Sequence, residues 1–259
     1  MTGWPAEWIR PDWPVPKNIR ALVTTRAGGS STGPYGAPRG GGMNLGFGSG
    51  DAVATVEHNR ARLSAQLPAA PRWLRQVHGA AVADAATVVG PMEADAAVTD
   101  RPATVAVVLV ADCLPVFLAD DKGRGVGIAH AGWRGLAAGV IQATVRALRA
   151  KIADPGAQLL AYLGPAIGPD HFEVGGEVLQ AMSRSLPGAA AAFVPVSAGK
   201  YRADLFALGT LALAAERVDA VYGGGVCTHC DAARFYSHRR DRVTGRQAGL
   251  IWIETEPRT

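Results

Sequence analysis

The segment Gly125–Gly135, GVGIAHAGWRG, indicates both the fold class and the place of a functional site. It opens with an apolar run typical of a buried strand, and that run stops at His130. A helix is expected to follow from Leu136. A turn between a strand and a helix needs only Gly, Asn or Asp. The histidine, Trp133 and Arg134 in this turn therefore point to a chemical role.

The composition indicates a globular protein that binds small molecules. The chain has 259 residues, enough to bury a substantial core, with 48% hydrophobic and 19% charged residues. The net charge is +4 and the isoelectric point is about 9.2, and the basic residues are scattered, which suits an anionic small molecule. No basic stripe interleaved with aromatic residues is visible, as single-strand binders require, so we expect no nucleic-acid partner.

The sequence contains no targeting or membrane pattern. The N-terminal stretch MTGWPAEWIRPDWPVPKNIR has three tryptophans and four prolines but no basic and apolar signal-peptide pattern. The longest apolar run, around Val105–Val110, is too short to span a bilayer. Three cysteines, Cys113, Cys227 and Cys230, are too few for a disulfide framework. We expect a cytoplasmic protein with reduced thiols and no membrane partner, and no pattern assigns an oligomeric state.

The order of apolar segments predicts a mixed α/β fold. We expect strands over Ile19–Thr25, Trp73–Val77, Ala96–Thr99, Thr104–Val110, Pro115–Ala119, Gly125–His130, Gln158–Leu163, Asp219–Tyr222 and Leu250–Ile253. We expect helices over Asp51–Gln66, Leu136–Lys151, Val174–Ser185 and Asp204–Val218, the second of them interrupted only by Gly139. Several strands follow one another without helices between them, which argues against a regular βαβ alternation. The chain is therefore predicted to form a single domain over residues 1–259, with mixed β-sheets covered by helices.

The segment Ala27–Gly50 is unusually rich in glycine. Its ten glycines make it either a mobile loop or a place where backbone approaches a ligand closely. It lacks the pattern of a nucleotide P-loop. Asp51 is the expected N-cap of the helix that follows, and Asn44 within the segment is a candidate substrate-binding residue.

Three polar residues stand at the ends of apolar segments and are candidates for one site. They are His78 in WLRQVHG, Cys113 in VVLVADCLP and His130, with separations of 35 and 17 positions. These separations fit no local metal finger, but neighbouring strands can deliver one side chain each to a common rim. Two imidazoles and a thiolate make a three-ligand zinc site with an open position, at which a water would become more acidic. The same residues can instead form a metal-free Cys–His nucleophilic dyad, or each can be merely structural.

Other residues nearby have candidate roles of their own. Asp112 can cap a turn, orient a histidine or take protons, which makes it a candidate catalytic residue. Trp133 and Arg134 can offer a stacking face and an anion-binding fork, or can pack under the following helix. Arg239 and Arg240 stand in a charged turn, and either can reach an anionic ligand.

The pair Cys227 and Cys230 forms a CxxC motif, CTHC, that invites a metal or redox interpretation. Only His229 and His238 lie near as further metal ligands, and no thioredoxin-like context surrounds the motif. We therefore expect this pair to be structural or incidental.

Several motifs in one order resemble the YfiH-like family. They are QVHG (76–79), ADCLP (111–115), AHAGWRG (129–135), LGPAIGP (163–169) and the pattern CT…FxSxRRDxxTGR…LIWI (227–253). That family carries the label multicopper polyphenol oxidase or laccase and is better described as purine nucleoside phosphorylases. The similarity runs from about Thr24 to Ile253. Cys230, His238 and the longer loop GAPRGGG depart from the family pattern.

The resemblance implies a metal-dependent enzyme that acts on purine nucleosides. It implies a single α/β domain and a zinc held by His78, Cys113 and His130. It also implies phosphorolysis of adenosine, inosine and methylthioadenosine, with a nucleoside and phosphate as substrates, and deamination of adenosine. The fold is similar to the catalytic domain of the cytotoxic necrotizing factor toxins, which are Cys–His deamidases. That similarity keeps the dyad interpretation open.

Two alternative functions stay open at this point. One is a hydrolase or amidase that uses Cys113 and His130 on a cell-wall precursor or a protein amide. The other is a non-enzymatic zinc-binding module. Copper is an alternative metal because Cu²⁺ outcompetes zinc at most sites, which makes copper-dependent polyphenol oxidase a further alternative. Laccase chemistry also needs a histidine-rich trinuclear cluster. Of the six histidines, only the scattered residues 58, 171, 229 and 238 would be left for it.

Overall fold

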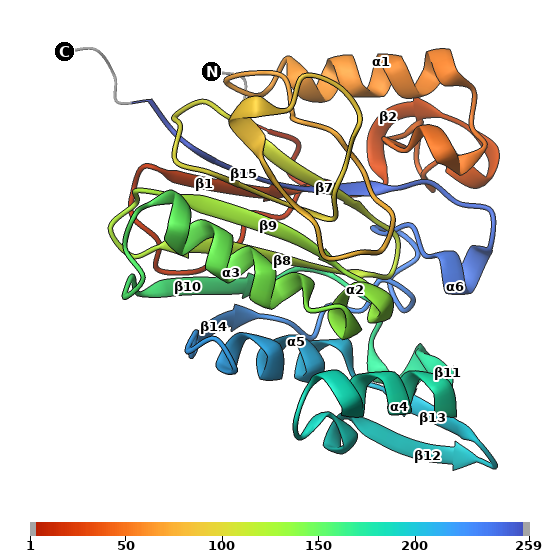
Figure 1. Ribbon diagram of the computed structural model, residues 1–259. Helices are drawn as coiled ribbons and strands as arrows, with labels where there is room; N and C mark the ends of the chain where they lie inside the picture. Colours follow the sequence, from red (N-terminus) through yellow and green to blue (C-terminus); the bar gives the residue numbers. More distant parts are fainter. Residues whose placement is uncertain (1–3, 256–259) are drawn as a thin grey trace.

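A six-stranded mixed sheet lies at the centre of the computed structural model, which describes residues 4–255 (Figure 1). Its strands follow the order β14 (Ala220–Gly223), β10 (Leu159–Leu163), β8 (Leu114–Asp120), β9 (Val126–Ala131), β6 (Ala96–Thr99) and β4 (Val82–Asp84). The β8–β9 hairpin is antiparallel, with Leu114 opposite Ala131. This register places Cys113, one residue before β8, beside Gly132, one residue after β9.

A second sheet packs on one face of the central sheet. It consists of β1 (Ile19–Val23), β15 (Gln247–Ile253) and β7 (Ala106–Val110), with β15 between the other two and antiparallel to both. Alternate apolar side chains from both sheets, among them Val108, Phe117, Ile128 and Ile251, form the core between the sheets. The outer face of this second sheet packs against helix α1 (Val53–Ser64), as Figure 1 shows.

Helices cover the other face of the central sheet. These are α2 (Trp133–Ala137), α3 (Val140–Lys151) and α5 (Leu205–Ala214), and Figure 1 shows α3 in front of the sheet and α5 below β10, beside β14. Helix α3 buries Val140, Ile141, Thr144, Val145 and Leu148, a helical spacing that forms one apolar stripe toward the sheet. The largest buried cluster of the described residues lies at this interface.

A smaller layer stands at one end of the molecule. It contains α4 (Gly176–Ser185) and the sheet β11 (Glu173–Gly175), β13 (Lys200–Ala203) and β12 (Phe193–Ser197). The remaining short elements are β2 (Ala27–Ser31), the parallel pair β3 (Leu74–Arg75) and β5 (Met92–Glu93), and α6 (His238–Asp241).

The predicted mixed α/β fold with sheets covered by helices is confirmed, while two local predictions are wrong. The helix expected from Leu136 begins at Trp133, whereas the interruption expected at Gly139 is present, with a φ of +83° that suits glycine. Asp51 does not cap α1, because Ala52 occupies the cap position without a side-chain bond. The Asp51 carboxylate instead accepts hydrogen bonds from Ser31 Oγ and from the Asn44 side chain.

The glycine-rich segment is folded back on itself rather than extended as an open loop. Buried Asn59 from α1 donates from Nδ2 to the backbone oxygens of Gly42 and Asn44, and its Oδ1 accepts from Ser30 N. A Cβ at Gly42 would lie 1.8 Å from Tyr35 O, so only glycine fits there. The close approach that glycine permits is therefore between two parts of the protein backbone.

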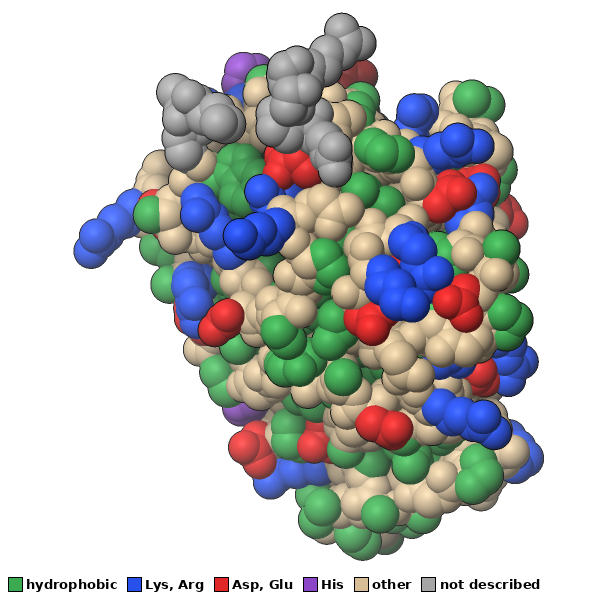
Figure 2. All heavy atoms as spheres, turned by 90° about the vertical axis from the view of Figure 1, so that its left-hand side faces the viewer, with side chains coloured by type: hydrophobic (Ala, Val, Ile, Leu, Met, Phe, Trp, Pro, Cys, Tyr) green, Lys and Arg blue, Asp and Glu red, His purple; other side chains and the backbone are tan. Residues whose placement is uncertain are grey.

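The surface carries both signs of charge. On the face shown in Figure 2, basic and acidic side chains are interspersed over mostly polar and backbone atoms. No helix within residues 4–255 combines the length and the apolar character needed to cross a membrane.

Candidate active site

The structure brings His78, Cys113 and His130 together, although they come from three separate segments. Their ligand-type atoms all lie within 4.8 Å of one another, and Cys113 Sγ is 3.9 Å from His78 Nε2. The His78 and His130 rings meet edge to face, with centroids 4.8 Å apart. His130 is buried within β9, Cys113 is half-buried between β7 and β8, and His78 is exposed in the loop after β3.

Gly132 explains why the turn after β9 has the sequence it has. A Cβ at this position would lie 2.8 Å from Cys113 Sγ and 3.2 Å from His78 Cδ2. Any other residue would therefore push two members of the group apart. The backbone passes close to the site because this residue has no side chain.

Asp95, at the start of β6, connects two of the three residues. Its fully buried carboxylate accepts from His130 Nδ1 at 2.9 Å. It also accepts from the backbone N–H groups of Val77, His78 and Gly79, at 3.1, 2.9 and 2.7 Å. With Nδ1–H donated to Asp95, His130 presents Nε2 as the free ring nitrogen. One carboxylate therefore sets the orientation of His130 and the position of the loop that carries His78.

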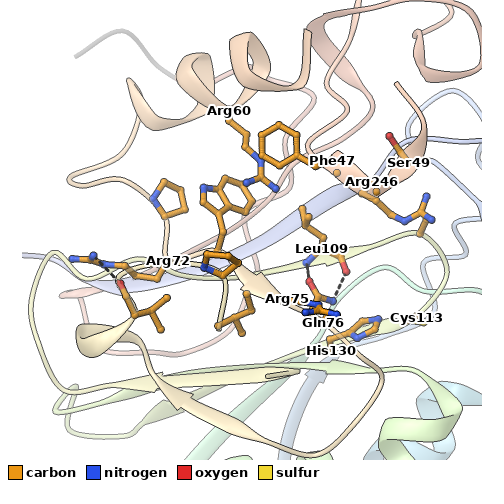
Figure 3. Close-up of a pocket in the computed structure, with 18 of the residues that line it drawn as sticks. Phe47, Ser49, Arg60, Arg72, Arg75, Gln76, Leu109, Cys113, His130 and Arg246 are labelled. Atoms are coloured by element: carbon orange, nitrogen blue, oxygen red, sulfur yellow. Dashed lines mark hydrogen bonds between the residues drawn. The ribbon is translucent and has the colours of Figure 1, made fainter. Parts of the chain in front are cut away.

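The loop of His78 is held at a second point by Gln76. The Gln76 amide donates to Leu109 O at 2.8 Å and accepts from Leu109 N at 2.7 Å, as the dashed lines in Figure 3 show. His78 itself has a φ of +60°, an uncommon conformation for a residue with a side chain. Such strain persists only where the surroundings hold it, and here Asp95 and Gln76 do so.

The electrostatics of the group favour a thiolate and a charged imidazole. Burial alone would raise the pKa of Cys113, but the adjacent His130 and His78 lower it to about 6. Burial alone would lower the pKa of His130, but the thiol of Cys113 and the carboxylate of Asp95 raise it to about 9. Burial likewise opposes ionisation of Asp95, yet its bonds to His130 and the backbone hold its pKa below the usual value. The thiolate is the form of cysteine that binds metals and attacks electrophiles.

The donor set and its spacing fit a zinc ion. Zinc binds sulfur at about 2.3 Å and imidazole nitrogen at about 2.1 Å in tetrahedral geometry, so two such ligand atoms of one ion lie about 3.4–3.6 Å apart. Cys113 Sγ and His78 Nε2, at 3.9 Å, are close to this spacing. The 4.8 Å limit on the separations within the group requires inward movement of at most about 1.4 Å. A carboxylate behind a ligating histidine, as Asp95 is behind His130, is a regular feature of zinc sites.

A cavity of about 1020 Å³ opens onto this group. The three residues, with Arg134, His238 and Arg246, line one end of it. Figure 3 shows Cys113, His130 and Arg246 close together at this end. Apart from the Cys113 thiolate, the charged side chains that line the cavity within residues 4–255 are cationic.

Of the two residues predicted after Gly132 to contact substrate, only Arg134 lines the cavity. It is exposed and lies 4.4 Å over the Trp133 ring. Trp133 itself packs against the core under the helices. Helix α2 has only five residues, and Arg134 is the second of them.

Asn44 does not line the cavity itself, but it hydrogen-bonds to two residues that do. It is fully buried, and its Oδ1 accepts from Gly46 N at 3.1 Å and from Arg246 N at 2.9 Å. Gly46 and Arg246 line the cavity, whereas Asn44 does not. Its place in the structure is to fix the cavity wall.

Buried Asp112 and half-buried Arg239 and Arg240 form a separate network, outside the cavity lining. Asp112 has a φ of +90°, and its carboxylate accepts from Thr228 Oγ1 and from Arg239 N, each at 2.7 Å. The carboxylate that orients a histidine is therefore that of Asp95. The Arg239 guanidinium donates to Glu173 O, and that of Arg240 donates to the carbonyls of residues 228, 229 and 235. These contacts give all three a structural role in holding the C-terminal segment beside Cys113.

The CxxC pair lies next to the same network. Cys227 Sγ accepts from Gly168 N at 3.2 Å, and Cys230 is exposed. His229 stacks on His171 with ring centroids 4.0 Å apart. The contact of Cys227 with Gly168 is structural, and the expectation that the pair binds no metal of its own stays a prediction.

Sequence reasoning missed Asp95 and Arg246. Asp95 opens an apolar strand in the segment ADAAVT, and a carboxylate in such a context is the signal that could have identified it. Arg246 belongs to the TGR part of the C-terminal motif. Its guanidinium donates to Thr244 O and Gly245 O, each at 2.9 Å, and burial lowers its pKa.

Fold and site together define a class: a mixed α/β protein with a His–Cys–His group at the end of a cationic cavity. The profile of the multi-copper polyphenol oxidoreductase laccase family matches residues 20–254. The chain belongs to this family.

Relatives with assigned names are purine nucleoside phosphorylases. The one from Pseudomonas aeruginosa is 47% identical over 250 residues, covering 95% of this chain and 98% of the relative. The one named YfiH from Escherichia coli is 44% identical, with the same coverage. A Neisseria meningitidis protein of known crystal structure has a TM-score of 0.89 and 44% identity, covering 96% of this chain and all of that one. YlmD of Geobacillus stearothermophilus has a TM-score of 0.83 and 30% identity, covering 92% and 93%. These relatives support an enzyme.

The family label does not extend to a laccase copper set. Among residues 4–255, His78, Cys113 and His130 are the one group of three or more His, Cys, Asp or Glu side chains close enough to share a metal ion. A trinuclear copper cluster has no counterpart in that part of the chain. Copper-dependent polyphenol oxidation is therefore not favoured.

Proposed function

We propose that the protein is a zinc-dependent purine nucleoside enzyme. It phosphorolyses adenosine, inosine and methylthioadenosine and also deaminates adenosine. The observation that carries this proposal is the His–Cys–His group at the end of a cavity lined by five arginines. The names of the relatives support the substrate class.

His78, Cys113 and His130 would hold the metal. When bound, zinc supplies a Lewis acid that makes a water molecule more acidic, which suits replacement of the C6 amino group of adenine by oxygen. Asp95 holds His130 in the tautomer that leaves Nε2 available. The thiolate of Cys113 is favoured by its two imidazole neighbours.

Phosphorolysis places a dianion next to a breaking bond between the purine and the sugar. Phosphate attacks C1′, the bond to the base nitrogen breaks, and the purine leaves with a proton. Arg134 and Arg246 supply positive charge at the reactive end of the cavity. Arginine forks match phosphate geometry and keep their charge at all relevant pH values. These two residues are the candidates for holding the attacking phosphate.

A metal-free Cys–His hydrolase or amidase is the second candidate, and one observation favours it. Cys113, His130 and Asp95 form a nucleophile, a base and an orienting carboxylate in sequence, with the last contact at 2.9 Å. That order is the arrangement of a catalytic triad. The substrate would then be a cell-wall precursor or a protein amide.

Product analysis after incubation with adenosine, with and without phosphate, tests the first candidate. Adenine and ribose 1-phosphate that form only with phosphate, and inosine that forms without it, are the expected products. Stoichiometric zinc that is lost in Cys113→Ala also favours the first candidate. Covalent labelling of a metal-free Cys113 by an electrophile, with no nucleoside turnover, would favour the second.

A further inference from the structure

The cavity extends well beyond the His–Cys–His group. Its volume of about 1020 Å³ lies at the upper end of the range of about 300–1,000 Å³ typical of small-molecule sites. Figure 3 shows Cys113, His130 and Arg246 at one end, with Phe47 and Arg60 above the middle and Arg72 at the far end. A nucleoside bound at the reactive end leaves this far part open.

Arg60 projects from α1 into the part of the cavity that lies away from the His–Cys–His group, and its side chain is held in a fixed position. Its guanidinium carbon lies 4.2 Å from the Phe47 ring centroid and 3.8 Å from that of Trp73. Its Nε donates to Leu45 O at 2.9 Å. Burial lowers the pKa of Arg60 to about 10, which still leaves it charged at neutral pH. Within residues 4–255 its two terminal nitrogens have neither a hydrogen-bond acceptor nor a carboxylate partner.

Arg72 adds a second cation that lacks a counter-ion. Its Nη1 donates to Val88 O at 3.2 Å, and its buried Nε has no partner among the described residues. Five arginines line the cavity, and among the residues that the structure describes only Arg75 has a carboxylate partner, Glu93 at 3.1 Å. A buried N–H without a partner, such as Arg72 Nε, is costly unless a ligand supplies an acceptor. The two aromatic rings hold the Arg60 guanidinium by cation–π contacts, which leaves its terminal N–H groups free to donate to a ligand.

We propose that Arg60 and Arg72, with Trp73 and Phe47, form a second subsite that binds the 5′-phosphate of a purine nucleoside 5′-monophosphate. This inference rests on the proposed function, because it takes the nucleoside part to lie toward the His–Cys–His group. The reacting atoms of the two proposed reactions are C1′ of the sugar and C6 of the base. A substituent on the 5′ oxygen leaves both C1′ and C6 free to react. The 5′ position is therefore where an anionic group can extend into the part of the cavity that lies away from the His–Cys–His group.

Inosine and inosine 5′-monophosphate provide the direct comparison. In phosphate-free buffer neither is phosphorolysed, and neither has a C6 amino group to lose, so equilibrium binding to the intact enzyme can be measured by titration calorimetry. We expect the monophosphate to bind at least tenfold more tightly than inosine. Equal or weaker binding of the monophosphate overturns the proposal.

Matched variants locate the phosphate. Arg60→Gln and Arg72→Gln are each expected to reduce the tenfold preference for the monophosphate to threefold or less. Arg62→Gln, at an exposed arginine of the same helix outside the cavity lining, should keep the full preference. Loss of the preference in Arg134→Gln, with full retention in the Arg60 and Arg72 variants, would place the phosphate at the reactive end and overturn the proposal. Thermal melting of each variant shows whether it is folded. If either the Arg60 or the Arg72 variant does not fold, the other variant still tests the proposal.

The proposed function can fail separately. If inosine and adenosine are phosphorolysed but the monophosphate shows no preference, only the second subsite is refuted. If neither nucleoside is bound or converted, the proposed function is refuted, and the subsite with it.

Discussion

Replacing Asp95 by asparagine should weaken the metal site and the fold together. Oδ1 of Asp95 accepts from His78 N and His130 Nδ1, and Oδ2 accepts from Val77 N and Gly79 N. An amide keeps one oxygen, so in either orientation its NH₂ group faces two N–H donors. Each hydrogen bond to a charged group contributes about 1.5–3 kcal/mol, so the loss of two sets a range of about 3–6 kcal/mol. Local relaxation reduces this energetic cost, and we expect the free energy of unfolding to fall by about 3 kcal/mol.

Urea unfolding and zinc titration measure the two effects of Asp95→Asn. The free energy of unfolding should fall by about 3 kcal/mol, and zinc affinity of the folded protein should fall about 10- to 100-fold, as for other carboxylates behind ligating histidines. Asp84→Asn is the control, since this partly exposed carboxylate of the same sheet binds Lys151 and one backbone N–H. It should cost less than about 1 kcal/mol and leave zinc affinity unchanged. An Asp95→Asn protein with wild-type stability and zinc affinity would refute the reasoning.

Three further predictions follow from the geometry. Gly132→Ala should fold but bind little zinc, because its methyl group would lie 2.8 Å from Cys113 Sγ; full zinc occupancy by elemental analysis would contradict this. Arg134→Gln should reduce phosphorolysis of adenosine about 30- to 100-fold, the equivalent of a lost bidentate contact of about 2–3 kcal/mol, and should affect deamination much less. Steady-state rates of both reactions at retained zinc content check it, and an equal drop in both would assign the residue to packing. Burial alone would raise the pKa of Asp120, but its bonds to Arg124 hold that pKa below the usual value of 3.8. The stabilisation from the ionised carboxylate is therefore present above about pH 4 and is lost as pH falls through the lower pKa of the folded state. In urea melts, the difference in free energy of unfolding between wild type and Asp120→Asn should shrink below about pH 4. A difference that stays constant from about pH 7 to about pH 2 would contradict this prediction.

Residues with a local signature could be predicted from the sequence. The mixed α/β class followed from apolar runs, and β6, with predicted bounds Ala96–Thr99, matches the structure at both ends. His78, Cys113 and His130 each stand at the end of an apolar segment and close to a turn-forming Gly or Pro, which is a visible pattern. The need for glycine at Gly132 was also readable, because it stands between a candidate ligand and a helix.

Residues whose role depends on distant pairing could not be predicted. Asp95 becomes the organising carboxylate only because β6 pairs with β9, which brings its backbone oxygen to His130 N at 2.7 Å. Arg60 enters the cavity only because α1 packs on the second sheet. The short strands β11, β12 and β13 were missed because three to five residues carry too little periodicity.

The central position of β15 has a consequence for the order in which the molecule is made. This strand is synthesised last, yet it lies between β1 and β7, which are complete more than a hundred residues earlier. Until residues 247–253 leave the ribosome, a nascent chain presents two unpaired strand edges to its surroundings, the kind of surface that attracts chaperones and promotes aggregation. Arg246, which completes the cavity wall, arrives with that strand. We therefore expect catalytic competence to appear only after residues 246–253 have been made and have paired, so that a translation product truncated before Arg246 carries the ligands of the site without its activity.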